Sequence, residues 1–577
     1  MFSYLFPSSS NRSPSSDPYP FSASLLSHFP TSGSIPPSLA PNPSPLDSFW
    51  TKHFTSPFSH QGEHEPLPTE ADVVIIGSGL TGICAVDRLV DELIEMSETG
   101  EGTKFTIVVL EARDFCSGAT ARNGGHLTSS PLLSFATLSS EFGLEEAIRC
   151  VKLEQYSIDY IVETCRKEGW VHEVELRIGG GNLHMFETEE QLNRARFELN
   201  AAKKADQDLS GFEWLTAHQV FERYRATSKF GGLLIPGNNV YPLKFVSKLF
   251  ERAQLRASRS NSVKLDLFTH CIVDSVERDE IKSEEGLERW NVRTNSKGTI
   301  SAKHVLHCTN GYLSSVLPEF STGPARIYPT RGQVLSVVPP SKQSPIPPYL
   351  EKPVNDSRGA LRWPSYGNAF SAETPFDIYM FQRSSPWSSR REIILGGCRE
   401  SSGPKGNYEF GQSFDGVGSV NEEVGRKLRR FLEWQFPRVF REEQYVDNEK
   451  AASWEADLEW TGIMGFREGG IPIIGPVYIE GQRQNGQWVA AGYSGHGMPR
   501  APASGQLIAP LVVQALLAES RHAATNGRKK LFELPDHFPR HYLTTSTGRP
   551  EVDAEVPGES EEAGWVVVEV PKVEVPR

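Results

Sequence analysis

The sequence has few cysteines and a shortage of basic residues. Seven cysteines in 577 residues, with no Cys-x-x-Cys pair, exclude a disulfide framework and a cysteine zinc site, and the odd number leaves at least one thiol unpaired. A reducing compartment is the simpler expectation, so we predict a cytoplasmic protein. Lys and Arg number 59 against 72 Asp and Glu, a net charge of −13. This balance argues against a nucleic-acid-binding protein, because that class needs a basic face.

Long apolar runs are also missing. A membrane-spanning helix needs about 18 consecutive apolar residues, and the longest candidate, 507–518, contains Pro510 and Gln514. We therefore expect no membrane span. No His, Cys, Asp and Glu cluster has the spacing of a metal site, and no Gly-x-Ser-x-Gly or Ser/His/Asp order is present. The sequence thus predicts neither a bound metal nor a serine hydrolase.

The two ends of the chain lack the composition of a folded domain. Residues 1–60 hold 17 Ser and 11 Pro but only four Asp, Glu, Lys or Arg residues. Such a segment buries too little apolar surface to offset its conformational entropy, and its start fits neither a signal peptide nor a mitochondrial presequence. We expect residues 1–65 to be a disordered extension and 541–577 to be an acidic, disordered tail.

The strongest positive signal is a dinucleotide-binding turn. The apolar run 71–76 is typical of a buried parallel strand, and it leads directly into Gly77-Ser78-Gly79-Leu80-Thr81-Gly82. Apolar residues then recur at helical spacing through 83–90. In such a unit the first glycine permits the turn, the second lets a pyrophosphate approach the backbone, and the third lets the helix pack on the strand. The phosphate then lies on the free N–H groups of the helix N-terminus.

An acidic residue follows the second predicted strand. The run 105–110 ends at Glu111, and a carboxylate at this point accepts hydrogen bonds from ribose hydroxyls. Glu111 comes 29 residues after Gly82, because the polar stretch 97–104 lengthens the connection. An acid disfavours a 2′-phosphate, so FAD or NAD is expected rather than NADP.

The segment after Glu111 resembles one family. Ser117-Gly118-Ala119-Thr120-Ala121-Arg122-Asn123-Gly124-Gly125-His126 is rich in small residues that let the backbone approach a large flat ligand. It is similar to the flavin segment of the FAD-dependent D-amino-acid oxidase superfamily, in particular the γ-glutamylputrescine oxidase and glycine/sarcosine oxidase-like members. Further segments resemble this family in the same order: 305–312, 329–333, 393–397, 460–464, 471–476 and 492–498.

The resemblance implies two interleaved domains. An α/β, Rossmann-like FAD-binding domain of the glutathione-reductase type is expected from residues 66–130, 246–328 and 451–540, the last part including a C-terminal helix. An α+β substrate domain with a large antiparallel sheet is expected from a helical and substrate part, 131–245, and from 329–450. Motif and resemblance together predict these cofactor-binding residues: Gly77, Gly79, Leu80, Thr81, Gly82, Glu111, Ala112, Arg113, Ser117, Gly118, Thr120, Arg122, Asn123, Gly124, Gly125, Thr309, Asn310, Gly311, Gly492, Gly495, His496, Gly497 and Met498.

The expected FAD is bound without a covalent link. In relatives that carry the flavin on histidine, that residue lies in the loop after the second strand, where this sequence has Arg122. In relatives that carry it on cysteine, the residue lies near 460–464, a segment without cysteine. The loop 493–498 precedes a predicted helix, 503–518, whose positive N-terminal end would stabilise negative charge on a reduced flavin. His496 is expected to add to this effect or to pack there.

The substrate side offers fewer signals. The strand expected over 378–383 alternates, so Tyr379, Phe381 and Arg383 share one face, and the resemblance places that face over the flavin. Arg383 is expected to bind a carboxylate bidentately and Tyr379 to bracket an amine or carboxylate. The alternative is that both are ordinary strand residues. With His496, they form the predicted catalytic group.

The sequence therefore predicts an FAD-dependent oxidase or dehydrogenase for an amine or amino acid. The C–N bond is oxidised by hydride transfer to flavin N5, water hydrolyses the imine, and O2 is the expected acceptor, giving H2O2. Three alternatives stay open. One is an FAD enzyme for 2-hydroxy acids or glycerol phosphate, the second is a flavoprotein with a binding or assembly role, and the third is an NAD enzyme.

Overall fold

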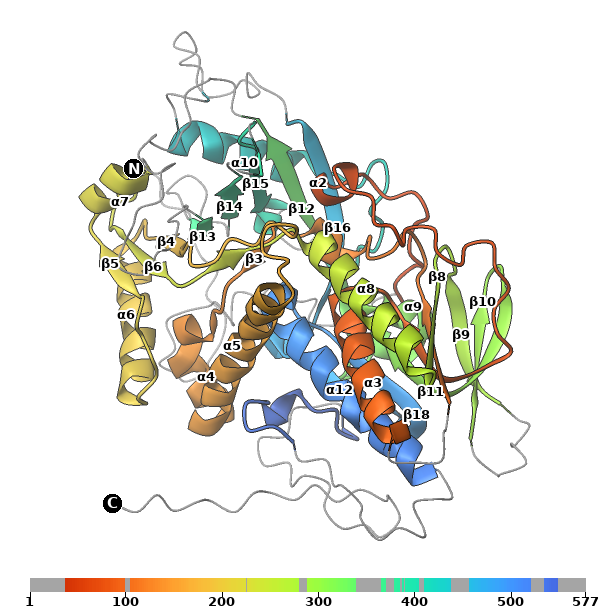
Figure 1. Ribbon diagram of the computed structural model, residues 1–577. Coiled ribbons are helices and arrows are strands. Elements are labelled where there is room, and N and C mark those ends of the chain that lie inside the picture. Colours follow the sequence, from red (N-terminus) through yellow and green to blue (C-terminus); the bar gives the residue numbers. More distant parts are fainter. Residues whose placement is uncertain are drawn as a thin grey trace, which may run out of the picture.

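Two β-sheets organise the chain in this computed structural model (Figure 1). The structure describes residues 37–98, 104–224, 226–279, 288–338, 365–369, 378–383, 387–388, 390–403, 409–436, 440, 456–519 and 534–547, with only the backbone for 365–369. Residues 1–36 and 548–577, which the sequence assigns to the disordered tails, lie outside the described residues.

The first sheet is mostly parallel, with the strand order β17-β18-β11-β1-β2-β8. Its neighbouring strands pair in parallel except for β17, which is antiparallel to β18. Two further strands, β10 and β9, continue from β11 as an antiparallel meander. The strands are β1 (Glu70–Ile76), β2 (Phe105–Leu110), β8 (Val263–Phe268), β9 (Val273–Arg278), β10 (Trp290–Thr294), β11 (Gly298–His307), β17 (Ile473–Ile479) and β18 (Gln482–Ala491).

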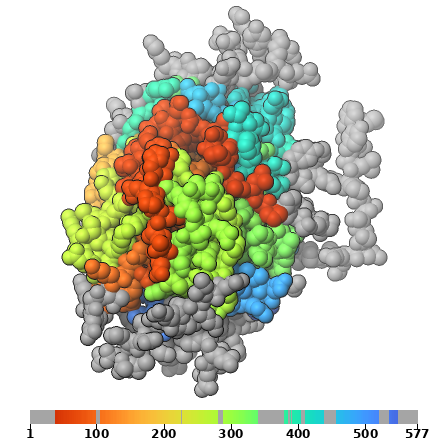
Figure 2. All heavy atoms as spheres, turned by 90° about the vertical axis from the view of Figure 1, so that its right-hand side faces the viewer, coloured from red at the N-terminus to blue at the C-terminus, as the bar shows by residue number. Residues whose placement is uncertain are grey.

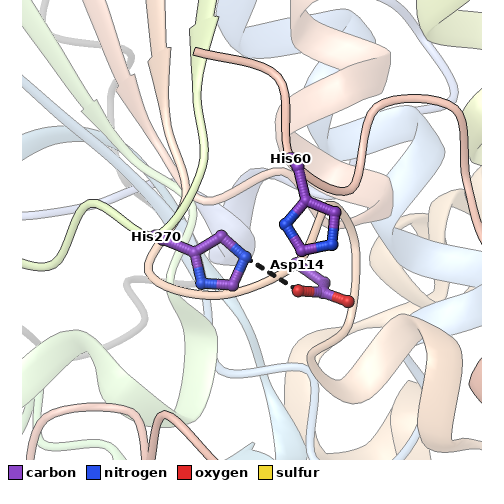
Figure 3. Close-up of side chains that lie close together, drawn as sticks. All are labelled: His60, Asp114 and His270. Carbon is purple, nitrogen blue, oxygen red and sulfur yellow. Dashed lines mark ion pairs between the residues drawn. The ribbon is translucent and has the colours of Figure 1, made fainter. Parts of the chain in front are cut away.

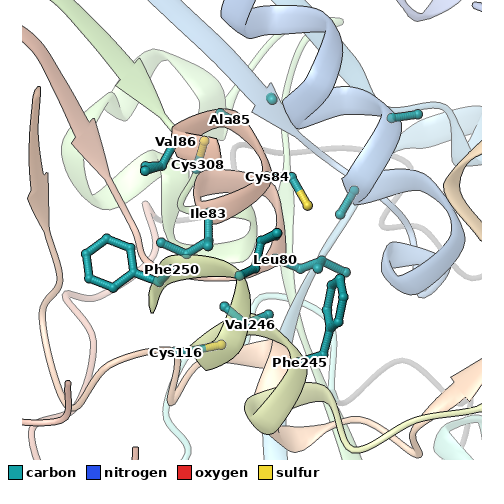
Figure 4. Packing of buried hydrophobic residues seen from close by; sticks show 14 of the residues in the cluster. Leu80, Ile83, Cys84, Ala85, Val86, Cys116, Phe245, Val246, Phe250 and Cys308 are labelled. Carbon is teal, nitrogen blue, oxygen red and sulfur yellow. The ribbon is translucent and has the colours of Figure 1, made fainter. Parts of the chain in front are cut away.

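Alternation along β1 builds a layer on each face of this sheet. Val73 and Ile75 belong to the core formed with helices α3 (Leu80–Glu98), α8 (Pro242–Ser260) and α12 (Gly497–Glu519), which lie side by side in Figure 1. Val74 and Ile76 belong to a separate core on the side of the β9–β10 meander. Figure 4 shows the first core, where side chains of α3 and α8 such as Ile83 and Phe250 gather. This is the expected Rossmann-like architecture.

The second sheet is antiparallel except where β13 pairs with β4, and its order is β16-β12-β15-β14-β13-β4-β6-β5. Helix α10 (Glu422–Gln435) packs on one face through a core that includes Leu428 and Phe431. The large antiparallel sheet confirms the expected substrate domain. The strands are β4 (Asn182–Met185), β5 (Glu213–Leu215), β6 (Gly232–Ile235), β12 (Tyr328–Val337), β13 (Ser365–Ala369), β14 (Ile378–Gln382), β15 (Ile393–Gly397) and β16 (Leu458–Phe466).

Helices α4 (Phe135–Phe142), α5 (Leu144–Lys167) and α6 (Glu189–Lys204) stand beside the second sheet, and α5 packs against α12. Gly143, at a φ of +88°, separates α4 from α5. The remaining short elements among the described residues include α2 (Phe49–Lys52), α7 (Ala217–Tyr224), α9 (Leu313–Val316), the paired β3 (His126–Leu127) and β7 (Asn238–Asn239), and the 3-10 turns η1 (Ala119–Arg122) and η9 (Arg540–Tyr542).

The expectation that residues 1–65 are disordered is wrong for 37–65. Phe49 and Trp50 are each 1% exposed, and Ser48 caps the short helix α2 that carries them. Trp50 meets Tyr241 edge-on, with ring centroids 4.8 Å apart. Figure 2 shows residues near the N-terminus, in red, crossing the face beside green residues from the middle of the chain. Composition averaged over 60 residues hides these two aromatic side chains, which bury themselves on a surface made by other segments.

The expectation that residues 541–577 are disordered is likewise wrong for 541–547. His541 and Tyr542 are buried, and His541 forms an ion pair with Glu146 of α5. An isolated β-bridge between Leu543 and Ile474 joins the C-terminal segment to β17, at the edge of the first sheet. Residues 541–547 therefore belong to the folded body.

Helix α12 is the described helix that is long and apolar enough to cross a membrane, over Gly497–Ala518. Within that stretch, 72% of the residues are buried inside the fold. The helix packs against α3 and α5, so its apolar surface is used in the core.

Candidate functional site

A cavity of about 1170 Å³ is lined by residues from both sheets. Its wall includes Gly77 and Glu111 at the ends of β1 and β2, the start of α3, the turn after β11 and the loop before α12. Ligands of parallel sheets bind at the carboxyl ends of the strands, so the first sheet directs a nucleotide to this cavity. Its volume exceeds the roughly 300–1,000 Å³ of an ordinary ligand pocket, which leaves room for a dinucleotide and a substrate.

The turn between β1 and α3 has the geometry of a phosphate cradle. Gly77 has a φ of +107°, and a Cβ on Gly82 would overlap the carbonyl oxygen of Gly77. By contrast, a Cβ on Gly79 would meet only the hydroxyl of Thr120, at 3.3 Å. The protein's own packing thus requires glycine at 77 and 82, whereas at Gly79 the free space belongs to the cavity. The N-terminus of α3 faces this space, as a pyrophosphate site requires.

Glu111 is held rigidly at the end of β2. One carboxylate oxygen accepts hydrogen bonds from the backbone N–H and the hydroxyl of Ser78, at 3.0 and 2.6 Å, and the other accepts from the N–H of Arg113 at 3.1 Å. The carboxylate lines the cavity and is 8% exposed. These bonds fix an acceptor at the position where a ribose is expected.

Arg122 connects three separate segments. Its guanidinium donates hydrogen bonds to the carbonyl oxygens of Ser117 at 2.9 Å, Thr461 at 2.8 Å and Leu46 at 2.6 Å. Burial, and then the charge of Arg113, lower the pKa of Arg122 to about 10, so it still carries a positive charge at neutral pH. It lines the cavity.

Asp415 is a site residue that sequence reasoning missed. Its carboxylate accepts a hydrogen bond from Arg113 at 2.8 Å and lies 3.7 Å from Arg122, and its side chain is 1% exposed. Asp415 thus contacts two arginines that lie about 300 residues earlier in the sequence, and no local motif marks it.

The predicted cofactor residues divide into two groups. Most line the cavity, and five stand behind it: Gly82, Ser117, Gly125, Gly311 and Gly492. Their role is to shape the backbone; the carbonyl oxygen of Met464, for example, would lie 2.6 Å from a Cβ on Gly311. The predicted residues that line the cavity are Gly77, Gly79, Leu80, Thr81, Glu111, Ala112, Arg113, Gly118, Thr120, Arg122, Asn123, Gly124, Thr309, Asn310, Gly495, His496, Gly497 and Met498.

The loop before α12 closes the cavity from the other side. His496 lines the wall, and its Nδ1 lies 3.3 Å from the hydroxyl oxygen of Ser130. Burial, and then the charge of Arg500, lower the pKa of His496 to about 4, so the imidazole is neutral at pH 7. The N-terminus of α12 at Gly497 is therefore the positive group that this loop presents to the cavity.

A second part of the wall comes from β3, β4 and the start of α4, and sequence reasoning missed it. Asn182 is 4% exposed, and its side-chain oxygen has no hydrogen-bond partner. Burial, and then His126, lower the pKa of His184 to about 4. Strand alternation along β4 places Asn182 and His184 on one face. Asn182 and His184 make the part of this wall that comes from β4 polar but uncharged.

The structure separates the two substrate residues predicted on the strand 378–383. Tyr379 lines the cavity, and its ring lies against Gly124, where a Cβ would overlap it. Arg383 does not line the cavity and is committed elsewhere: it pairs with Glu175 and with Glu392, the latter at 3.2 Å. Its guanidinium also lies 4.7 Å from the ring centroid of Phe49.

The expected role of Arg383 as carboxylate clamp is therefore wrong. The alternation was correct, since Tyr379 and Phe381 both join the core on one face of the sheet. However, four residues of extended strand advance the chain by about 13 Å, which carries Arg383 beneath the N-terminal segment.

The structure also brings three potential metal ligands together. His60, Asp114 and His270 come from three distant segments and bring one potential ligand atom each to within 4.8 Å of the others (Figure 3). Spacing along the chain could not reveal them, because the ligands are 54 and 156 residues apart in sequence.

Comparison with known proteins identifies the family. The sequence profile of the FAD dependent oxidoreductase family matches residues 72–511. The chain belongs to this family. FAD is accordingly its cofactor, and the cradle fits it: Gly79 leaves space for the pyrophosphate, and the buried hydroxyl of Thr309, which has no hydrogen-bond partner, lines the same cavity.

Solved structures share the fold at low identity. Glycine oxidase from Geobacillus kaustophilus is 17% identical with a TM-score of 0.51, covering 82% of this chain and 99% of that one. An L-amino acid deaminase from Proteus vulgaris, lacking its specific insertion, is 16% identical with a TM-score of 0.52, covering 84% and 96%. Both support the two-domain architecture of this FAD-dependent oxidoreductase.

Curated relatives match over a shorter stretch. The gamma-glutamylputrescine oxidoreductase of Escherichia coli (strain K12) is 24% identical over 253 residues, which is 43% of this chain and 51% of that protein. The chain spans about half the length of the curated relatives it matches.

Proposed function

We propose that this FAD-dependent oxidoreductase oxidises the C–N bond of an amine or amino acid, with O2 as the final electron acceptor and H2O2 as the product. The observation that carries the proposal is the continuous cavity, in which the FAD cradle leads directly to the uncharged wall of Asn182, His184 and Tyr379. When bound, FAD accepts a hydride from the carbon next to the nitrogen.

The wall suits a neutral amine. An amine must give up its extra proton before its lone pair can assist C–H cleavage, and a buried site lowers the pKa of a protonated amine. The side-chain oxygen of Asn182 and the neutral ring of His184 are acceptors for amine N–H groups. These residues would orient the amine without stabilising its protonated form.

The same pKa values disfavour the main alternative, oxidation of a 2-hydroxy acid or a polyol phosphate. Removal of an O–H proton needs a base whose pKa lies near the working pH. Two of the four described histidines that line the cavity, His184 and His496, have pKa values of about 4, so these two are weak bases. An amine needs no such base, because its neutral form already carries the lone pair.

The arginines of the cavity favour an amine without a carboxylate beside the oxidised carbon. Five of the described arginines line the cavity. Arg122 donates to three carbonyl oxygens, and Arg113, Arg194 and Arg500 pair with Asp415, Glu198 and Glu154. The guanidinium of Arg399 lies 4.5 Å from the ring centroid of Phe466. A carboxylate would have to compete with these partners. We therefore propose simple amines, rather than α-amino acids, as the preferred substrates.

Non-covalent attachment of FAD and a cytoplasmic location remain part of the proposal. Cys271 and Cys308 line the cavity, and burial raises the pKa of the Cys271 thiol to about 11 and that of Cys308 further, so both are protonated and poorly nucleophilic. All seven cysteines lie among the described residues, where each is buried and forms no disulfide, which agrees with a reducing compartment.

The test is an anaerobic screen of the holoprotein against amines, amino acids, 2-hydroxy acids and glycerol phosphate, following loss of the visible flavin absorbance. Reduction by an amine supports the proposal, and reduction only by a hydroxy compound overturns it. Reoxidation by air with stoichiometric H2O2 supports O2 as acceptor, whereas reoxidation only by an added dye rejects it. Asn182→Ala should raise KM about tenfold for the best amine, since a hydrogen bond of roughly 1.4 kcal/mol is lost, with unchanged FAD content.

A further inference from the structure

Three potential ligands meet beside the adenosine end of the FAD site (Figure 3). His60 comes from the N-terminal segment, Asp114 from the chain after β2, and His270 from the chain after β8. Nε2 of His270 lies 2.8 Å from a carboxylate oxygen of Asp114. The rings of His60 and His270 are stacked, with centroids 5.1 Å apart and planes 1° from parallel.

We propose that this cluster binds a divalent ion of the zinc class, and that the ion clamps the N-terminal segment to the chain that shapes the adenosine end of the cofactor site. Two imidazoles and one carboxylate are ligands that Zn²⁺ prefers, whereas Mg²⁺ and Ca²⁺ prefer oxygen alone. Water would complete a four-coordinate shell.

To share one ion, the ligand atoms must move closer and one of the two parallel rings must turn. Zinc bonds to nitrogen and oxygen at about 2.0–2.2 Å, so two ligand atoms of a tetrahedral ion lie about 3.4 Å apart. The three ligand atoms here lie within 4.8 Å of one another. The side chain of His60 is 65% exposed, which gives it room to turn toward the other two.

A carboxylate already orients His60 for this role. Nδ1 of His60 lies 2.8 Å from a carboxylate oxygen of Glu63. Metal-binding histidines commonly give their second ring nitrogen to a carboxylate, which fixes the tautomer and strengthens the ligand. With Nδ1 held by Glu63, the ion would bind Nε2 of His60.

Hydrogen bonds connect the cluster to the FAD site. The N–H of His270 donates to the carbonyl oxygen of Arg113 at 3.2 Å, and the N–H of Cys271 donates to that of Glu111 at 2.9 Å. The N–H of Thr269 donates to the carbonyl oxygen of Gln61 at 3.0 Å. Glu111 and Cys271 both line the cavity. An ion at the cluster would lock these three segments in one arrangement.

The experiment uses the untagged, full-length holoprotein, freed of metal with a chelator. Titration with Zn²⁺ should give one site per chain, raise Tm and slow the release of FAD in a dilution assay, and Mg²⁺ should do none of these. His60→Ala and Asp114→Asn should each weaken Zn²⁺ binding at least tenfold. Glu63→Gln should do the same, because Glu63 holds Nδ1 of His60. His270→Asn is a further ligand variant, chosen because His270 has a φ of +51° and Asn tolerates that conformation.

His64→Ala is the matched control, since His64 is an exposed histidine four residues from His60 and outside the cluster. It should bind Zn²⁺ as the unchanged protein does. Equal Zn²⁺ affinity in the ligand variants and in His64→Ala would overturn the site. Binding that depends on His60 but leaves Tm and FAD release unchanged would overturn the clamp.

Discussion

The indole N–H of Trp50 donates a hydrogen bond of 2.6 Å to the carbonyl oxygen of Asn123. Two residues earlier, the hydroxyl of Ser48 donates to the carbonyl oxygen of Ala121, also at 2.6 Å. The N-terminal segment thus holds the loop 119–125 from outside, while the other side of that loop lines the FAD cavity. Part of a Ser- and Pro-rich extension is in this way a structural support of the cofactor site.

Trp50→Ala should lower both stability and FAD content. Removal of a buried Trp side chain costs about 3–5 kcal/mol, and the carbonyl of Asn123 loses its donor. Urea unfolding and the ratio of flavin to protein absorbance measure the two effects. Deletion of residues 2–36 is the control and should leave both unchanged. Normal flavin content in a folded Trp50→Ala variant would show that the loop does not depend on this support.

Gly79→Val should abolish FAD binding and leave the apoprotein folded. The new side chain would fill the space left for the pyrophosphate, while the protein itself offers only Thr120 as a neighbour at 3.3 Å. Gly82→Ala is the contrast, because its Cβ would overlap the carbonyl oxygen of Gly77 and disrupt the turn even without ligand. Flavin stoichiometry and apoprotein Tm separate the two effects. Full FAD occupancy in Gly79→Val would contradict the assigned phosphate cradle.

The free energy of unfolding should fall as pH drops from 6.5 toward 4. His307 and His496 each have a folded pKa of about 4, below the ordinary 6.5, chiefly because burial disfavours the charged ring. The unfolded chain therefore binds more protons across this window, and each histidine contributes about 3 kcal/mol that is present above pH 6.5 and lost by pH 4. Urea unfolding at several pH values measures the slope.

Replacement of either histidine by Gln should reduce this slope. His496→Gln should also shift the visible flavin spectrum, because His496 lines the cavity. Nε2 of His307 lies 2.8 Å from the side-chain oxygen of Gln487, and neither residue lines the cavity. His307→Gln should therefore leave the spectrum unchanged. An unaltered slope in both variants would show that these rings are not buried in the neutral form.

Arg383→Met should change kcat/KM less than threefold per bound FAD but destabilise the fold. Breaking a buried ion pair by removing one partner costs about 3–5 kcal/mol, and the low end is expected, because Glu175 keeps Lys244 at 2.9 Å. Tyr379→Phe should do the opposite, lowering kcat/KM about tenfold with little loss of stability, since its ring packing on Gly124 is retained. A large loss of kcat/KM in folded Arg383→Met would restore Arg383 as a substrate residue.

The phosphate cradle and Glu111 could be predicted because their information is local. In Gly77–Gly82, strand, turn and helix are contiguous in sequence, so the spacing of the three glycines marks the turn by itself. The buried strands β1 and β2 likewise follow from short apolar runs. The order of family-like segments extended this local information to the two-sheet fold and to FAD.

The tertiary structure decided the contacts between distant segments. Alternation placed Tyr379 and Arg383 on one face, but only the packing of Phe49 and of Glu175 determined that Arg383 lies outside the cavity. Composition described residues 1–60 as an average, whereas burial depends on whether a particular side chain such as Trp50 finds a complementary surface. The cluster of His60, Asp114 and His270 exists for the same reason: long-range packing brings side chains together whose spacing in sequence carries no signal.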